Sequence, residues 1–323
     1  MYTILIVIFV LVILGIAYEQ YKRHMSKHYK VDGKFIGVGG HKLHYVLKGE
    51  GNPTVIFESG LDYGGHIIWR NIQDKLSVNF TTLSYDRAGI LRSQRGKNPK
   101  TCEFMAEELH SMIDALKLPK PYILVGHSLA GLIYRCYIDK YSSDVAGVVL
   151  LDPTHPESFE NFPKKIRDMS TKTPPKWLVK TLTSLGILRL SFPMILKKFM
   201  KDSLKSEEKN YQEAHDMFHH SIDAYLEEQK NLTLDCQESK GISFGTLPVT
   251  VLGATKVPMD KPDYHKMIEV MKTCHTETVS HCKESKLIFV DSGHTIQFEK
   301  PDVVVKTIEE MASFYRHNNK GNV

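Results

Sequence analysis

The chain has 323 residues, of which 42% are hydrophobic and 24% charged, and its formal net charge is +5 at pH 7. This composition is ordinary for a folded protein and excludes disorder of the whole chain. The length suits one large domain with an insertion, or two small domains. The weak positive charge is not gathered into a basic block interleaved with aromatic residues, so we expect no nucleic-acid partner.

The first segment predicts a membrane anchor. Residues 2–18 are uncharged and apolar, which is close to the shortest helix that crosses a bilayer. No basic residue precedes this segment, and the basic residues that follow it are Lys22, Arg23, Lys27 and Lys30. That asymmetry would keep the C-terminal flank in the cytoplasm. We therefore expect residues 1–30 to form a single-pass anchor, with a cleaved signal peptide and secretion as the alternative.

Short apolar runs alternate with helical patterns along the rest of the chain. Two early runs, 34–38 and 42–47, flank Gly39-Gly40 and predict a β-hairpin. The later runs are continuously apolar, as in strands covered by helices on both faces, and lie at 55–57, 80–85, 122–125, 145–151, 249–252 and 287–290. Apolar residues at helical spacing occupy 102–116, 129–141 and 303–315. This alternation predicts an α/β fold with a mostly parallel central sheet flanked by helices.

Residues 153–245 interrupt the alternation, because they contain helical patterns and no clear buried strand. We expect a helical cap here, inserted into a core that consists of residues 31–152 and 246–323. Within the cap, residues 174–205 mix apolar side chains with Lys and Arg and contain one acidic residue, Asp202. This mixture is typical of helices that lie on anionic bilayers. A cap whose apolar face packs on the core and lines a pocket would have the same composition.

Ser128 is the strongest catalytic candidate. It lies in the segment Gly126-His-Ser-Leu-Ala-Gly131, directly after an apolar run and before a helical pattern. Small neighbours let a strand and a helix approach closely, so that the serine occupies a tight turn with its hydroxyl above the sheet. A serine in a phosphate- or cofactor-binding turn is the alternative. We expect His127 to be a structural neighbour at the substrate site and not the base, because its side chain would point away from the hydroxyl.

Four segments carry a resemblance to a known family. They are Glu58-Ser59-Gly60-Leu61, Ser84-Tyr85-Asp86-Arg87-Ala88-Gly89, the turn around Ser128, and Ser292-Gly293-His294. Over about residues 34–152 and 246–316 the chain resembles the α/β-hydrolase superfamily, in particular its esterase and monoacylglycerol-lipase-like members. The resemblance implies an α/β-hydrolase fold and an oxyanion hole made by the backbone amides of Leu129 and Leu61. Gly60 would let the backbone approach the substrate.

Two details of the resemblance concern single positions. Asp86 and Arg87 are expected to brace the loop beside the nucleophile rather than to act on substrate. Ala130 stands where the family more often has glycine, and Gly131 follows it.

A serine nucleophile needs a base, and the base needs an acid that orients it. His294 follows the last apolar run, and the chain order Ser, acid, His is the order that this fold uses. Asp152 directly ends a strand-like run and is the preferred acid. Asp260 lies in the loop after the next run, the position that most family members use, and remains the alternative. Asp263 and Asp291 are weaker candidates.

Other His and Cys residues do not predict a metal site. Cys274-His275 and His281-Cys282 lack the common zinc spacing. His215 is followed four residues later by another histidine on a predicted cap helix, but no glutamate lies between them in the metalloprotease arrangement. We expect no metal and no cofactor. Five scattered cysteines favour free thiols in a reducing compartment, with a Cys274–Cys282 bridge as the alternative.

These residues together predict a serine hydrolase that cleaves carboxylic esters through an acyl-enzyme. The apolar cap and the anchor favour a lipid-like acyl ester, such as a monoacylglycerol, as the substrate. An amide or peptide hydrolase would use the same residues, and a non-catalytic binding module is a third alternative. Hydrolysis of epoxides or haloalkanes is disfavoured because that chemistry wants an aspartate at position 128. We expect no obligate protein partner and a catalytic domain on the cytoplasmic side of the membrane.

Overall fold

An eight-stranded sheet forms the centre of the computed structural model, which describes residues 2–199, 205–281 and 283–318. The strands lie in the order β1-β2-β4-β3-β5-β6-β7-β8. Their bounds are β1 (Lys34–Val38), β2 (His41–Lys48), β3 (Thr54–Glu58), β4 (Thr82–Tyr85), β5 (Tyr122–His127), β6 (Val145–Leu151), β7 (Val249–Ala254) and β8 (Lys286–Val290). Each predicted strand overlaps one of these ranges, and the predicted α/β architecture is confirmed.

The sheet begins with two antiparallel pairings, β1 with β2 and β2 with β4, and continues with parallel pairings to β8. Gly39 and Gly40 join β1 to β2 with φ values of +56° and +97°, which glycine adopts without strain. Strands β3 to β7 are buried along their whole length, which explains their continuously apolar sequences. Because parallel strands end at one edge of the sheet, the loops that follow them meet there.

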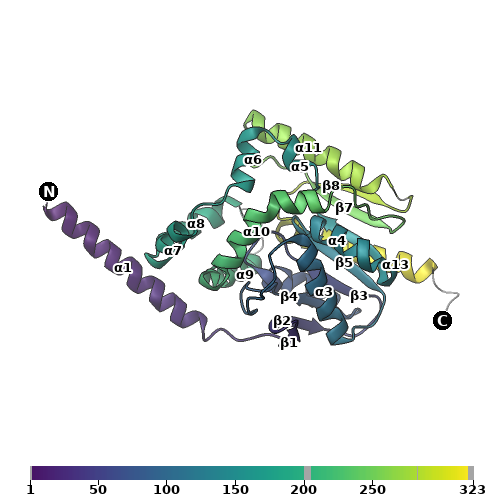
Figure 1. Ribbon diagram of the computed structural model, residues 1–323, viewed down its shortest axis with the longest axis horizontal. Helices are drawn as coiled ribbons and strands as arrows, with labels where there is room; N and C mark the ends of the chain where they lie inside the picture. Colours follow the sequence, from purple (N-terminus) through teal and green to yellow (C-terminus); the bar gives the residue numbers. More distant parts are fainter. Residues whose placement is uncertain (1, 200–204, 282, 319–323) are drawn as a thin grey trace.

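Helices cover both faces of the sheet (Figure 1). The helices α3 (Cys102–Leu116) and α4 (Ala130–Tyr141) pack on one face. The helices α2 (Arg70–Leu76) and α13 (Pro301–Asn318) pack on the other. The sequence predicted α3, α4 and α13 from their apolar spacing.

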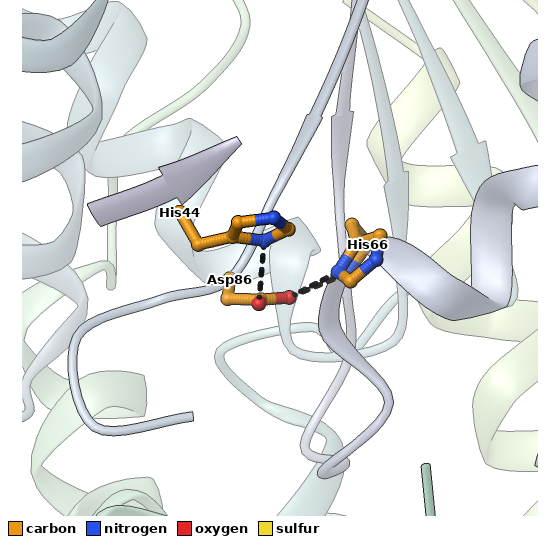
Figure 2. Close-up of side chains that lie close together, drawn as sticks. All are labelled: His44, His66 and Asp86. Atoms are coloured by element: carbon orange, nitrogen blue, oxygen red, sulfur yellow. Dashed lines mark hydrogen bonds and ion pairs between the residues drawn. The ribbon is translucent and has the colours of Figure 1, made fainter. Parts of the chain in front are cut away.

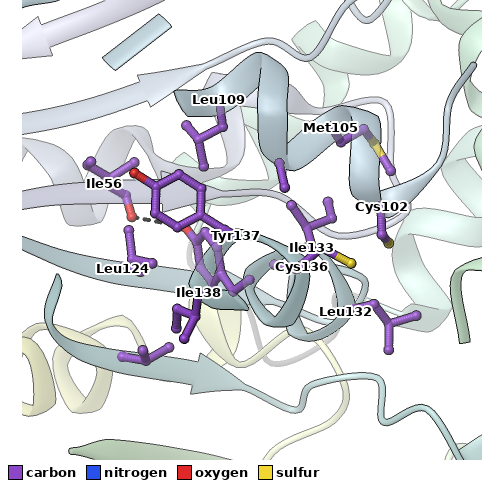
Figure 3. Close-up of a cluster of buried hydrophobic side chains, with 14 of the residues drawn as sticks. Ile56, Cys102, Met105, Leu109, Leu124, Leu132, Ile133, Cys136, Tyr137 and Ile138 are labelled. Atoms are coloured by element: carbon purple, nitrogen blue, oxygen red, sulfur yellow. Dashed lines mark hydrogen bonds between the residues drawn. The ribbon is translucent and has the colours of Figure 1, made fainter. Parts of the chain in front are cut away.

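A cluster of buried apolar side chains joins α3 and α4 to the sheet (Figure 3). Leu124 of β5 and Ile56 of β3 share this cluster with Leu109 of α3 and Ile133 of α4. Ile123, the neighbour of Leu124, packs in the cluster on the opposite face, because successive side chains of a strand alternate. Each such side chain contributes about 1.5–3 kcal/mol to folding, so both faces hold β5 firmly in place.

Among the described residues, six helices lie between β6 and β7, where the sequence predicted a helical cap. They are α5 (Ser158–Asn161), α6 (Lys164–Thr171), α7 (Lys176–Ser184), α8 (Ile187–Phe199), α9 (Lys205–Asp216) and α10 (Phe218–Glu238). The prediction that His215 and His219 share one helix is wrong, since α9 ends at Asp216 and α10 begins at Phe218. The carbonyl of Asp216 accepts a hydrogen bond from the Arg189 side chain, which satisfies a helix end there.

The helix α11 (Pro262–Val279) follows β7 and was not predicted. Its buried positions include Tyr264, Ile268, Met271 and His275, which recur at helical spacing. The pattern contains a polar residue and is flanked by charged ones, so the apolar periodicity of this segment is weak. Pro262 in the first turn is a start signal that could have indicated the helix.

The N-terminal helix α1 (Tyr2–Ser26) projects from the body of the molecule (Figure 1). Its apolar side chains from Tyr2 to Ile16 are exposed, whereas Gly15, Glu19 and Ser26 are buried. It is long and apolar enough to cross a membrane, by length and composition. The α1 helix is therefore a candidate membrane span.

A buried carboxylate fixes the start of the sheet to the segment that follows β3. Asp86, directly after β4, accepts hydrogen bonds from Nδ1 of His44 in β2 (2.9 Å) and Nδ1 of His66 (2.7 Å) (Figure 2). His66 belongs to the short helix η1 (Gly65–Trp69), and its backbone N–H also donates to Asp86. Burial alone would raise the pKa of the Asp86 carboxyl, but the two imidazoles hold that pKa well below its usual range.

Replacing this carboxylate is expected to destabilise the fold. Asp86→Asn should lower the free energy of unfolding by about 3 kcal/mol at neutral pH, because it breaks a buried charged network. Since the folded-state pKa is depressed, this contribution is present above the unfolded-state pKa of about 4 and is lost as the pH falls further.

Urea unfolding of wild type and of Asp86→Asn at neutral and acidic pH measures the loss of stability and its dependence on pH. The matched control is Asp74→Asn, which removes an exposed ion pair with Lys48 and should cost less than about 1 kcal/mol. Equal losses in the two variants would contradict a bracing role for Asp86.

Candidate active site

Ser128 occupies a strained turn between β5 and α4. Its φ is +51°, in the left-handed region that residues other than glycine rarely adopt. The backbone N–H of Ser128 donates to the Leu151 carbonyl (3.1 Å), and the N–H groups of Gly131 and Thr154 donate to the Ser128 carbonyl (2.9 and 2.8 Å). These bonds tie the turn to the end of the neighbouring strand β6. Such strain persists only where the surroundings hold it, and it occurs at functional sites.

The small residues around Ser128 are required by close packing. A Cβ atom at Gly126 would lie 2.6 Å from the Cβ of Ala130 and 2.7 Å from the ring of Tyr134. A Cβ atom at Gly131 would lie 2.6 Å from the carbonyl oxygen of Thr154. The methyl group of Ala130 fits because the residue opposite it, Gly126, has no side chain. This explains how the chain accommodates alanine at that position.

His294 lies in the loop after β8 and contacts Asp152 at the end of β6. The Nδ1 atom of His294 is 2.6 Å from Oδ2 of Asp152, and Oδ1 of Asp152 accepts the backbone N–H of Ala254 (3.1 Å). Burial would raise the pKa of Asp152, but these contacts, led by the His294 hydrogen bond, lower it. An ionised Asp152 draws the ring proton of neutral His294 to Nδ1 and leaves a lone pair on Nε2.

The structure brings Asp152 to His294 and holds the alternative acids elsewhere. The side chain of Asp260 is fully exposed and bonds to Nε2 of His265 (2.8 Å). Asp263 lies in the first turn of α11, and Asp291 is exposed. Asp260, the alternative acid in the loop after β7, is thus paired with His265, whereas Asp152 is the acid that contacts His294.

His127 connects the Ser128 turn to the His294 loop. Its Nε2 atom lies 2.9 Å from the backbone carbonyl of His294, and the centroids of the two rings are 4.6 Å apart. Burial lowers the pKa of His127 to about 3, with a smaller effect from His294. The ring is therefore neutral at pH 7, and Nε2–H donates to the carbonyl. His127 positions the loop that carries His294, and Gly60 packs against its other edge.

The hydroxyl of Ser128 makes no hydrogen bond to the described residues. Catalytic hydrogen bonds are often long or unformed in a protein without substrate and form when a substrate binds. The backbone amides of Leu61 and Leu129 likewise donate no hydrogen bond within the described part of the chain.

A buried arginine holds the loop that precedes Leu61. The Nη1 and Nη2 atoms of Arg87 donate to the carbonyl oxygens of Ser59 and Gly60, each at 2.7 Å. The same guanidinium bonds Glu58 at the end of β3 (2.7 Å) and both carboxylate oxygens of Glu228 in α10 (3.0 and 2.8 Å). Arg87 therefore fixes the loop to the sheet and to the cap, in agreement with the bracing role expected from the resemblance.

Aromatic side chains of the cap cover the same loop. The Tyr63 ring lies 4.6 Å from the ring of Phe218 and 6.0 Å from that of Tyr225, both on α10. Its hydroxyl lies 3.3 Å from Nδ1 of His215, which stacks on Phe192 of α8. The cap thus packs a cluster of aromatic rings around Tyr63, two residues after Leu61.

His275 is a neighbour of the site that the sequence reasoning did not assign to it. Its Nε2 atom lies 3.7 Å from Oδ1 of Asp152, and the side chain is buried in α11. Burial lowers the pKa of His275, so the ring beside Asp152 is neutral. Nothing in its sequence context indicated this contact, because it depends on how α11 packs against β7.

One group of side chains has the residue types of a metal site. The ligand atoms of His44, His66 and Asp86 lie within 4.8 Å of one another and are buried (Figure 2). The Nδ1 atoms of both histidines face Asp86 oxygens at hydrogen-bond distance, and Nε2 of His44 lies 2.6 Å from the carbonyl of Asp32. Both nitrogens of His44 therefore face acceptors, which fits a hydrogen-bonded brace better than metal ligation.

The cysteines contribute no further cluster among the described residues. Cys102, Cys136, Cys236 and Cys274 are buried free thiols. Cys282, and with it the suggested Cys274–Cys282 bridge, lies outside the described residues.

Residues 53–301 match the family model described as alpha/beta hydrolase fold. The chain belongs to this family. The match extends from just before β3 to the start of α13, so it includes the Ser128 turn, Asp152 and the His294 loop. Membership agrees with the strand order and with the meeting of these residues at one edge of the sheet.

Individual curated proteins resemble parts of the chain. The uncharacterized protein YqjL of Bacillus subtilis (strain 168) is 30% identical over 150 residues, which cover 46% of this chain and 56% of that protein. The (Lyso)-N-acylphosphatidylethanolamine lipase of Bos taurus is 29% identical over 153 residues, 43% of each protein. The chain spans about half the length of the curated relatives it matches.

Solved structures of the hydrolase family share the fold. The Cif epoxide hydrolase from Acinetobacter nosocomialis superimposes with a TM-score of 0.71 at 15% sequence identity, over 92% of this chain and 96% of that chain. At this identity the likeness shows the common fold and not a common substrate.

A methyl group at Gly60 is expected to disturb the candidate site. Its Cβ would lie 2.8 Å from Nδ1 of His127 and 3.0 Å from Cβ of Ser128, so Gly60→Ala should lower the free energy of unfolding by about 1–3 kcal/mol. Gly37→Ala is the matched control, because no atom lies within 4 Å of the corresponding Cβ and φ is not positive there. Urea unfolding compares the two, and equal stability would contradict the close approach at Gly60.

Proposed function

We propose that the protein is a serine hydrolase that cleaves carboxylic esters through an acyl-enzyme. Ser128 is the nucleophile, His294 the base and Asp152 the acid. The observation that carries this proposal is the hydrogen bond between His294 and Asp152 beside the left-handed turn of Ser128. A Ser, an Asp and a His that follow the strands β5, β6 and β8 at one edge of the sheet form the arrangement that activates a serine hydroxyl.

The reaction begins when Nε2 of His294 accepts the proton of the Ser128 hydroxyl and the serine oxygen attacks the ester carbonyl carbon. Asp152 stays ionised and stabilises the imidazolium. The amides of Leu61 and Leu129 donate hydrogen bonds to the oxyanion of the tetrahedral intermediate. His294 then gives the proton to the leaving alcohol, and the acyl group remains on Ser128. A water molecule that gives a proton to His294 then attacks the acyl carbon, and His294 returns the proton to the Ser128 oxygen as the carboxylic acid leaves.

The substrate that we propose is a lipid-like acyl ester, such as a monoacylglycerol. The aromatic cluster that the cap forms around Tyr63 makes this part of the molecule apolar, which suits an acyl chain better than a charged group. A relative in Bos taurus bears the name of a lipase, which supports the same substrate class. Serine at position 128 favours ester hydrolysis over epoxide opening, because an epoxide hydrolase needs a carboxylate nucleophile there.

The helix α1 is proposed to anchor the catalytic domain on the cytoplasmic face of a membrane. Lys22, Arg23 and Lys27 follow its apolar part and favour that orientation. Contacts of α1 with the cap support its retention in the mature protein over cleavage as a signal peptide. Among them, Glu19 of α1 pairs with Arg189 of α8 at 2.6 Å, and both side chains are buried.

Labelling with a fluorophosphonate probe tests the nucleophile. Wild type should be labelled and Ser128→Ala should not, because the probe reacts with an activated serine hydroxyl. The control is Ser111→Ala, which removes an exposed hydroxyl on α3 and should leave labelling unchanged. Hydrolysis of nitrophenyl esters should rise toward longer acyl chains. Labelling without ester turnover would indicate an amide or peptide substrate. A folded wild-type protein that is not labelled would contradict the proposal that the protein is a serine hydrolase.

A pair of aspartate variants tests the acid. Asp152→Asn should lower kcat by about 10³–10⁴-fold, because an amide cannot hold His294 in the reactive tautomer. Asp260→Asn should leave kcat within about twofold, since its exposed side chain contacts only His265 among the described residues. Ester hydrolysis by the two purified variants gives the comparison. A large loss in Asp260→Asn alone would assign the acid to the loop after β7.

A further inference from the structure

The corner between α7 and α8 lies against the helix α1. A Cβ atom at Gly15 of α1 would collide with the carbonyl oxygen of Leu185, and one at Gly186 would lie 2.5 Å from the carbonyl oxygen of Gly15. The two backbones are therefore in direct contact, as at the small-residue interfaces of membrane helices. Figure 1 shows α7 and α8 beside α1, away from the sheet.

A buried ion-pair network holds this contact one turn further along α1. Arg189 of α8 bonds Glu19 of α1 through Nε (2.6 Å) and Asp216 of α9 through Nη1 (2.5 Å). Asp216 also bonds Nζ of Lys22 (2.8 Å) and the hydroxyl of Tyr29 (2.5 Å). Charges that are paired in this way, out of contact with water, fix the corner at one height along the helix.

That height is the end of the apolar part of α1. Gly15 lies within the uncharged segment, and Glu19 lies one turn, or about 6 Å, further along the axis. If α1 crosses a bilayer, its last apolar turn lies where acyl chains give way to head groups. The corner, which touches Gly15, is carried to the same depth.

The side chains that the corner exposes suit that depth. Ile187, Leu190 and Met194 follow the spacing of one helix face on α8 and are exposed by 45%, 61% and 76%. Trp177 at the start of α7 is 69% exposed, and tryptophan is enriched at the membrane–water interface. Lys180 of α7 pairs with Asp223 of α10. The corner therefore has a polar side toward α10 and an apolar side that carries the exposed residues named above.

We propose that the α7–α8 corner is seated in the interfacial layer of the bilayer that α1 crosses. The cap is then docked on the lipid surface, and an acyl ester in the membrane lies beside the aromatic cap rather than beyond a layer of water. A bilayer is favoured over a protein partner because the helix that contacts the corner enters the bilayer itself. The inference rests on the proposed anchoring by α1 and not on the proposed chemistry.

The fluorescence of Trp177 in the full-length protein tests this docking. The chain contains two tryptophans, and the other, Trp69, is fully buried in the core. Protein is reconstituted into phosphatidylcholine vesicles whose acyl chains carry bromine near the glycerol end or near the methyl end. The emission of Trp177 is obtained by subtracting the emission of the Trp177→Phe variant from that of wild type. We expect a loss of this emission that is larger with bromine near the glycerol end, and an unquenched Trp69.

A second comparison tests whether α1 sets the position of the corner. Gly15→Leu should reduce the quenching of Trp177, because its side chain displaces the Leu185 carbonyl. Ile13→Leu, on the exposed face of the same helix, should not change it. Unchanged quenching in Gly15→Leu would overturn the placement of the corner by α1.

The outcomes separate the docking from the anchoring. Protein that resists alkaline extraction from the vesicles but shows no quenching of Trp177 would overturn the docking and leave the anchor standing. Protein that alkaline extraction removes would overturn both. Fluorophosphonate labelling of the same samples reports the proposed chemistry independently of either result.

Discussion

The buried guanidinium of Arg87 is the interaction on which the site depends. It joins Glu58 at the end of β3, the carbonyls of Ser59 and Gly60, and Glu228 of the cap. Burying a cation is costly unless each polar hydrogen finds an acceptor, and here two carboxylates and two carbonyls supply them. Because the same side chain reaches sheet, loop and cap, these three parts keep one relative position beside Ser128.

The cap connects the proposed active site to the N-terminal helix through polar contacts at both of its ends. Glu228 bonds Arg87 beside the loop that precedes Leu61, and Asp216 bonds Arg189, which in turn bonds Glu19 of α1. Between these two networks, aromatic rings such as Tyr63 and Phe218 pack against one another. Each network is buried, so separating the cap from either partner would leave charges without counterions. The cap is therefore a fixed bridge between the N-terminal helix and the proposed site.

Local sequence signals predicted most elements of the fold because their causes are local. Strands β3 to β7 are buried along their whole length because both of their faces are covered, and α3 and α4 show their buried faces at helical spacing. The same signals failed at α11, whose buried face includes His275, and at His215 and His219, which lie in two helices. In those places a tertiary contact, and not the apolar pattern, determines the structure.

By itself, the sequence determined the α/β architecture, the inserted cap, the N-terminal apolar helix and the candidates Ser128 and His294. These follow from residue types at short spacing, where turn chemistry and periodicity leave few alternatives. The tertiary structure alone decided that Asp152 and not Asp260 contacts His294, and that Arg189 joins the cap to α1. Both pairings join residues more than one hundred positions apart, and such contacts depend on how strands and helices pack rather than on any local pattern.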